Sequence, residues 1–69
     1  MRISGRNQLK GTVTEVKLGA VVAEVIVQLD GGQQIVSVIT VDSAQSLALK
    51  SGDTVVAIIK STEVMIGKD

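Results

Sequence analysis

Apolar residues that alternate with a period of two restrict the fold of this chain more than any other feature of its sequence. The alternation runs through residues 9–16 and 21–29, with a break at residues 17–19. Its apolar members are Val13, Val21, Ala23, Val25, Val27 and Leu29. Successive side chains of a β-strand point to opposite faces, so this spacing predicts two strands, each with one apolar face.

Further strand patterns follow these two segments. Asp30, Gly31 and Gly32 tolerate positive φ and precede another alternating run, residues 33–41, which predicts a β-hairpin with a short loop. Residues 54–60 are rich in β-branched side chains and predict a fourth strand. Residues 64–66 predict a short fifth strand.

The pattern between the third and fourth strands predicts one short helix. Asp42 fits an N-cap, with Gln45 at the capping-box position. Residues 47–49, Leu-Ala-Leu, supply an apolar face, and Gly52 fits a C-terminal cap. The chain is therefore expected to be all-β, a five-stranded OB-fold-like barrel with one short helix between strands 3 and 4. Another small barrel, of the SH3-like kind, is the alternative.

The chain lacks the cross-links that often stabilise small domains. It has 69 residues with no cysteine and no histidine, which removes disulfides and zinc sites. Hydrophobic residues nevertheless make up 45% of the chain, and residues 21–29 and 54–59 carry them on both strand faces, a pattern typical of strands buried on both sides. We therefore expect residues 1–69 to form a single domain that associates with other copies of itself.

Composition and charge argue against several functional classes. Seven basic and seven acidic residues balance, so no net field attracts nucleic acid or an anionic membrane. The chain has no aromatic residues, whereas nucleic-acid-binding barrels stack bases on aromatic side chains. Ser-Lys pairs are the only nucleophile and base combination left, and Lys60-Ser61 could be such a pair, but adjacent residues on an extended strand point to opposite faces, so a catalytic dyad there needs a bend. With no signal peptide and no apolar run long enough to span a bilayer, we expect a soluble cytoplasmic protein that is not an enzyme.

Hydroxyl-bearing and cationic residues occur near the expected strand ends and the helix entrance. They are Ser4, Arg6, Thr40, Ser43, Lys60 and Ser61. Such donors, together with backbone N–H groups, suit a tetrahedral oxyanion, because each oxygen accepts several hydrogen bonds and the cations balance its charge. The same residues also fit structural roles as helix caps, a solvated arm and a strand end. Spacing alone leaves both interpretations open.

Two segments that contain these residues resemble the molbindins, the Mop family of small molybdate- and tungstate-binding proteins. Residues 3–11, ISGRNQLKG, are similar to the family's S-A-R-N-Q-L-x-G opening, with Gly5 in place of the usual alanine. Residues 60–66, KSTEVMI, are similar to its K-S-S/T-D/E-V-M-I/L close. The likeness extends over essentially the whole chain, which would make residues 1–69 a single Mop-type OB-fold domain.

The resemblance implies a function and an assembly. It implies a homohexamer, a trimer of dimers, that binds molybdate or tungstate at subunit interfaces with no organic cofactor. By position, the opening motif would contribute Ser4 and Arg6, and the closing motif Lys60 and Ser61. Thr40 and Ser43 would come from the segment before the helix. The chain has no helix-turn-helix and no phosphate-binding loop, so we expect storage or buffering of the anion. The alternatives are binding of a molybdenum-pterin cofactor, a purely structural oligomer and a nucleic-acid-binding barrel.

Overall fold

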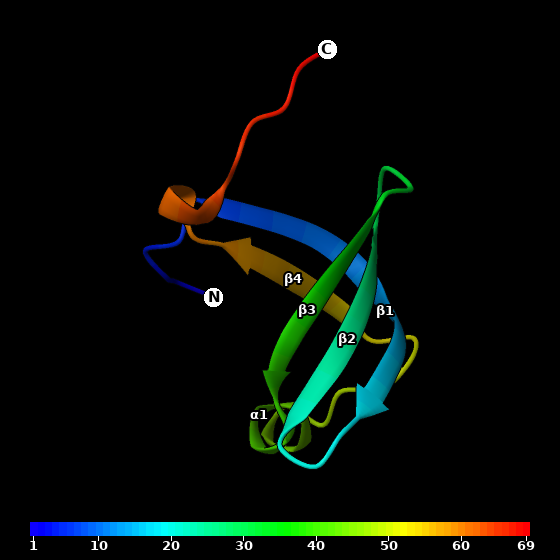
Figure 1. The fold of residues 1–69 in the computed structure, drawn as a ribbon. Helices are drawn as coiled ribbons and strands as arrows, with labels where there is room; N and C mark the ends of the chain where they lie inside the picture. The colour runs from blue at the N-terminus through cyan, green and yellow to red at the C-terminus, as the bar shows by residue number, and fades with distance from the viewer.

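A computed structural model describes residues 1–69 as one four-stranded antiparallel sheet with a single short α-helix. The sheet order is β3-β2-β1-β4 (Figure 1). The elements are β1 (Asn7–Leu18), β2 (Val22–Leu29), β3 (Gln34–Thr40), α1 (Val41–Ser46), β4 (Thr54–Ile59) and the 3₁₀ helix η1 (Ser61–Glu63). The predicted all-β class, with one helix between the third and fourth strands, is confirmed. No helix of the chain is long and apolar enough to cross a membrane.

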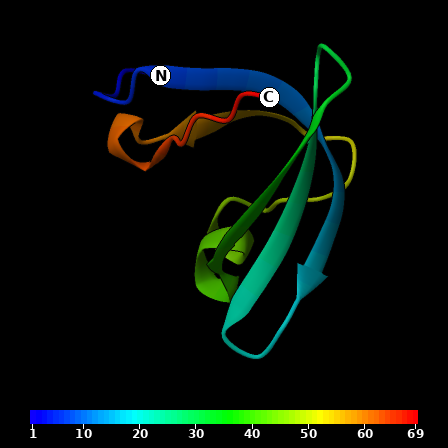
Figure 2. The same cartoon turned by 45° about the horizontal axis from the view of Figure 1, so that its top comes forward.

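Strand β1 is shared by the two halves of the sheet. Residues 7–12 pair with β4, and residues 11–18 pair with β2. The register with β2 shifts between Val13 and Glu15, a β-bulge of the kind that bends a strand. Figure 2 shows β1 curving between its two partners, so that the sheet curls around an interior.

The interior of the curled sheet holds a small aliphatic core. Val13, Val25 and Val27 form its centre. Val16, Leu29, Ile39, Leu49 and Val55 pack against them. The outer face of β2 and β3 carries apolar residues that stay open to solvent, with Val22 49%, Val36 59% and Val38 64% exposed. The apolar residues predicted on both strand faces are therefore buried on only one face in the single chain.

The hairpin predicted at residues 30–32 is confirmed. Strands β2 and β3 pair in register from Val22↔Thr40 to Gln28↔Gln34. The Leu29 N–H donates to the Gln33 carbonyl at 2.7 Å, and the Gly32 N–H donates to the Leu29 carbonyl at 2.9 Å. Gly32 has φ +98°, a conformation that glycine adopts without steric cost.

The predicted helix exists, but the caps predicted at Asp42 and Gly52 are wrong. Thr40, not Asp42, is the N-cap, because its extended backbone lets its Oγ1 accept the Ser43 N–H at 3.0 Å. At the other end, Ala48 adopts the positive φ, 52°, expected of a C-terminal cap. Gly52 lies in the later turn before β4, where its N–H donates to the Val13 carbonyl.

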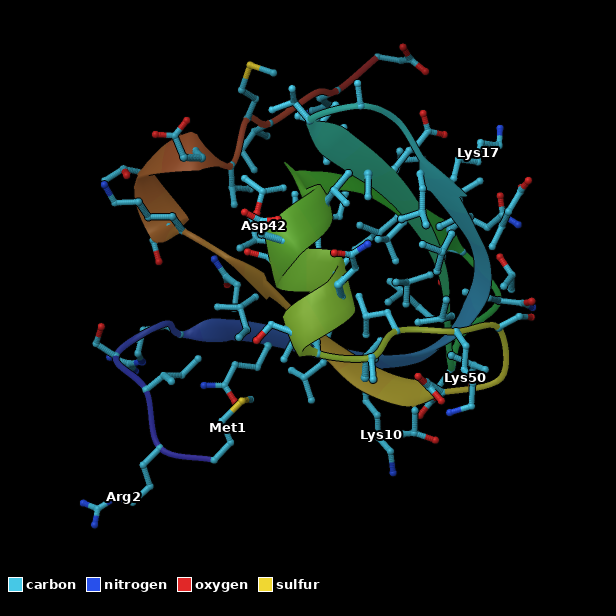
Figure 3. All side chains as sticks on the ribbon, turned by 90° about the horizontal axis from the view of Figure 1, so that it is seen from below. Met1, Arg2, Lys10, Lys17, Asp42 and Lys50 are labelled. Atoms are coloured by element: carbon cyan, nitrogen blue, oxygen red, sulfur yellow. The ribbon has the colours of Figure 1, made fainter.

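The helix covers one end of the curled sheet. Figure 3, seen from below, shows α1 lying over this end with the strands around it. Ala44 is the buried residue of the helix. The apolar face predicted at residues 47–49 lies beyond the last helical turn, where Leu47 is exposed and Leu49 packs against the core.

The fifth strand predicted at residues 64–66 does not form, so the sheet has four strands. Hydrogen bonds from the Glu63 N–H to the Lys60 carbonyl and from the Val64 N–H to the Ser61 carbonyl close η1. This turn redirects the chain, and the C-terminal segment leaves the sheet (Figure 1). Met65 and Ile66 are 92% and 90% exposed.

Without a fifth strand, the facing sides of β3 and β4 border an apolar groove. The groove has a volume of about 490 Å³. Its walls include Val13, Val25, Ile39, Leu49, Val55 and Ile59. Val56 and Ile58, which also line the groove, are 38% and 47% exposed, and exposed apolar residues of this kind are typical of surfaces that another chain covers.

The turn before β4 is closed by Asp53. Its carboxylate accepts the Lys50 backbone N–H at 3.0 Å and lies 3.1 Å from Lys50 Nζ. The backbone hydrogen bond, followed by the side-chain hydrogen bond, lowers the pKa of Asp53 below its usual value. A lowered carboxyl pKa in the folded state stabilises the fold above the unfolded-state pKa, and this stabilisation disappears as the pH falls through the folded-state value.

We expect Asp53→Asn to lower the melting temperature at pH 7, because the amide loses the charge that strengthens both contacts. The difference from the wild-type protein should shrink as the pH falls below about 4, where the unfolded-state carboxyl becomes protonated. Thermal unfolding between pH 2 and 7 measures this, with Asp30→Asn as a control for an exposed carboxylate in the hairpin turn. A difference that is constant across this range would rule out the titration of Asp53 as its cause.

Candidate functional site

Pairing of β1 with β4 brings the opening and closing segments of the chain together. Asn7 and Ile59 are partners in the sheet, and Asn7 Nδ2 also donates to the Ile59 carbonyl at 3.1 Å. Ser4 and Arg6 come before this pair, and Lys60 and Ser61 come after it. Figures 1 and 2 both place the N-terminal segment beside η1 at this end of the sheet. We call Ser4, Arg6, Lys60 and Ser61 the strand-end cluster.

The strand-end cluster carries two cations with no acidic partner. All four of its residues are exposed. The two ion pairs of the chain, Lys17 with Glu24 and Lys50 with Asp53, involve neither Arg6 nor Lys60. Lys60 is the N-cap residue of η1. Both positive charges are therefore free to balance a bound anion.

Thr40 and Ser43 form a separate pair at the entrance of α1. The Ser43 N–H donates to Thr40 Oγ1 at 3.0 Å, and the Thr40 hydroxyl donates to Ser43 Oγ at 2.8 Å. The structural role foreseen for these residues, capping the helix, is thus present. The Ser43 hydroxyl proton is not used in this pair, so it can still be donated to a ligand.

The two groups of donors lie at opposite ends of β1. The strand-end cluster flanks Asn7, the first residue of β1. Thr40 pairs with Val22, which lies next to the partner of Leu18 at the other end of β1. Figure 1 shows η1 and α1 well separated, with the length of the sheet between them. A strand rises about 3.3 Å per residue, so even the bent β1 keeps the groups too far apart for one small anion to contact both within a single chain.

One residue of the opening segment has a role at this end that sequence reasoning missed. Gln8 Nε2 donates to the Gly5 carbonyl at 2.7 Å, which ties the segment before β1 to the strand itself. The sequence feature that could have indicated this bond is the position of Gln8, three residues after Gly5. At this spacing a side chain can form a hydrogen bond with the backbone of a turn.

The chemistry of the strand-end cluster suits an oxyanion. Its side chains provide two hydroxyls, one ammonium and one guanidinium, all of which donate hydrogen bonds. Charge-assisted hydrogen bonds from such cations to anionic oxygens are roughly twice as strong as neutral ones. The cluster contains no carboxylate, imidazole or thiolate that would bind a metal cation.

Comparison with known proteins identifies the family. Residues 3–66 match the model of the TOBE domain. Molybdenum-pterin-binding protein 3 from Clostridium pasteurianum is 52% identical over 66 residues, which cover 96% of this chain and 97% of that protein. Molybdenum transport protein ModE from Azotobacter vinelandii is 44% identical over 66 residues, which cover 96% of this chain and 24% of that longer protein.

Solved structures have the same fold. The structure of MopII from Clostridium pasteurianum matches with a TM-score of 0.92 and 48% identity, covering 97% of this chain and all of that one. The cytoplasmic molybdate-binding protein ModG, with molybdate bound, matches with a TM-score of 0.83 and 44% identity, covering 88% of this chain and 43% of that one. The resemblance to the Mop family is thus confirmed, and this chain belongs to the TOBE domain family.

Proposed function

We propose that this protein binds molybdate or tungstate reversibly at interfaces between its own copies. The observation that carries the proposal is the strand-end cluster, where two cations without acidic partners and two hydroxyls lie at the same end of the sheet. The molybdate-bound relative supports the choice of anion. Donors replace the hydration shell of the anion, while Lys60 and Arg6 balance its charge.

A complete site needs two chains. Thr40 and Ser43 lie at the far end of β1 from the strand-end cluster, so a second copy must supply this pair to the cluster of the first. The exposed apolar residues on β2 and β3, the apolar groove and the solvent-exposed C-terminal segment support such association. We propose a homo-oligomer, with a hexamer built as a trimer of dimers as the expected form.

Binding without chemical conversion fits storage and buffering of the anion. The side chains of Lys60 and Ser61 make no hydrogen bond with each other, and the Lys60 backbone carbonyl accepts the Glu63 N–H that closes η1. We therefore propose that the protein is not an enzyme. A cytoplasmic location is proposed because the molybdate-binding relative ModG is described as cytoplasmic.

Binding of a molybdenum-pterin cofactor is the second candidate, because the Clostridium pasteurianum relatives are named molybdenum-pterin-binding proteins. The chain has no aromatic residue on which a pterin ring could stack. Its strand-end cluster offers only donors and cations, which suit the oxyanion part of such a molecule. The free anion is therefore the better candidate, and calorimetric titration with each ligand distinguishes the two.

We expect molybdate and tungstate to raise the melting temperature and sulfate to raise it much less. At 100 times Kd, a ligand adds about 2.7 kcal/mol to the free energy of unfolding, which shifts the midpoint of a domain this size by on the order of 10 °C. Sulfate has the same charge but is smaller, so donors spaced for molybdate fit it poorly. Thermal unfolding with each anion, at fixed protein concentration and with the oligomer mass measured on the same sample, tests this. No shift with any anion would contradict the proposed function.

A further inference from the structure

The turn before β1 is held by two side chains that face each other across the sheet. Gln8 of β1 and Ile58 of β4 are partners in the register, so their side chains lie on the same face. Gln8 Nε2 donates to the Gly5 carbonyl at 2.7 Å. Ile58 packs so closely against Gly5 that a Cβ added there would lie 2.7 Å from Ile58 Cγ2. The cross-strand pair of Gln8 and Ile58 therefore restrains Gly5, which lies between Ser4 and Arg6 in the segment before β1.

Restraining the Gly5 carbonyl also fixes the amide of the next residue. The Gly5 C=O and the Arg6 N–H belong to the same planar trans peptide, in which they point in opposite directions. With its oxygen bound to Gln8, this peptide directs the Arg6 N–H away from the Gln8 side chain. The Arg6 N–H donates to no acceptor within the chain, and Arg6 lies outside β1. It is an oriented, unused donor between Ser4 and the start of the strand.

Glycine at position 5 makes this restraint important. A glycine has more accessible backbone conformations than any other residue, so the Gly5–Arg6 peptide has little intrinsic preference for one orientation. Its neighbours Ser4 and Arg6 are both exposed and make no hydrogen bonds that would hold the turn. The orientation of the Arg6 N–H therefore depends on the Gln8 hydrogen bond and the Ile58 contact.

We propose that Gln8 is a positioning residue that presents the Arg6 backbone N–H to the bound oxyanion. This inference rests on the proposed oxyanion site and adds a main-chain donor to the positive charge that Arg6 contributes, with Gln8 acting through the Gly5–Arg6 peptide. A donor at a fixed position discriminates between anions of different size, so Gln8 also contributes to the preference for molybdate over sulfate.

The test replaces Gln8 by methionine, which has nearly the same shape but no donor. Calorimetric titration should show an affinity for molybdate lowered about fivefold, the size expected for one hydrogen bond, with a smaller loss for sulfate. Gln34→Met is the matched control, because Gln34 is also an exposed strand glutamine, lies on β3 and makes no side-chain hydrogen bond. Melting temperatures without ligand should be alike for the wild type and both variants.

A spectroscopic readout separates positioning from general loosening of the fold. In ¹⁵N-labelled wild-type protein, the Arg6 amide resonance should shift on addition of molybdate, and in Gln8→Met this shift should be much reduced. Unchanged affinity and an unchanged Arg6 shift in Gln8→Met, while the wild type still binds, would overturn the role of Gln8 alone. A wild-type protein that binds neither molybdate nor tungstate would contradict the proposed function as well.

Discussion

Lys60→Ala should lower the affinity for molybdate at least about 30-fold while leaving the oligomer mass unchanged. Lys60 is one of two cations in the strand-end cluster, and neither of the two ion pairs of the chain uses it. Lys60 is exposed in the single chain, but the proposed site lies at an interface between copies, where removing one charged partner from a desolvated, hydrogen-bonded pair costs about 2–5 kcal/mol because the other charge is left without compensation. Calorimetric titration of the wild type and variant with molybdate measures the change.

The control for this experiment is Lys10→Ala. Lys10 is an exposed lysine on β1 that points outward into solvent (Figure 3), so its removal changes the net charge equally without touching the cluster. Ser61→Ala provides a comparison, because loss of one neutral hydroxyl hydrogen bond should lower the binding free energy by only about 0.5–1.5 kcal/mol. Equal affinities for Lys60→Ala and Lys10→Ala would remove Lys60 from the site.

Gly11→Ala should lower the free energy of unfolding by about 1–3 kcal/mol, the usual cost of forcing an extra methyl group into a filled space. Gly11 is buried where β1 passes from β4 to β2. An added Cβ would lie 2.5 Å from the Gln28 carbonyl oxygen and 2.7 Å from Val27 Cγ1. The first of these atoms belongs to the backbone of the paired strand, so the overlap can be relieved only by moving β1 away from β2.

Thermal or urea unfolding at one fixed protein concentration measures this loss, because association would otherwise change the apparent stability. Gly67→Ala is the matched control, since a Cβ at Gly67 would meet no atom within 4 Å. For a domain of this size, each kcal/mol corresponds to a melting temperature lower by about 4–8 °C. A Gly11→Ala protein as stable as Gly67→Ala would mean that β1 and β2 separate at this point without cost.

The elements that could be predicted from the sequence are those decided by local patterns. Alternating residues such as Val25 and Val27 predicted β2 because successive side chains of a strand point to opposite faces. The pair Gly31 and Gly32 predicted the hairpin because the turn requires a positive φ. The helix caps could not be placed in the same way, since Thr40 and Asp42 are both good N-cap residues and the backbone conformation at Thr40 decides between them.

The fifth strand was wrongly predicted for a different reason. Residues 64–66 have a strand-like composition, but a strand needs a partner with free backbone groups. The preceding η1 turn directs this segment away from its own sheet (Figure 1), and the composition of residues 64–66 does not reveal this turn. The sequence therefore indicated that residues 64–66 favour an extended conformation, but not whether the chain provides a neighbouring strand with which they can pair.

The candidate site was predictable as a set of residues but not as an arrangement. The motifs at Ser4 and Lys60 are far apart in sequence, and the pairing of Asn7 with Ile59 places them at one end of the sheet. The distance between this end and Thr40 depends on the length and course of β1, which no residue pattern encodes. The hydrogen bond from Gln8 to Gly5 also depends on the turn geometry.

The position of donors at both ends of β1 has a consequence for how the protein releases its ligand. In the proposed assembly each chain contacts two anions. Its strand-end cluster binds one of them, and Thr40 and Ser43 at the entrance of α1 bind the other. Each bound anion then contacts two neighbouring chains, so anion binding stabilises the oligomer and loss of the anion destabilises it. Dilution, which favours separated chains, should therefore act as a release signal in its own right.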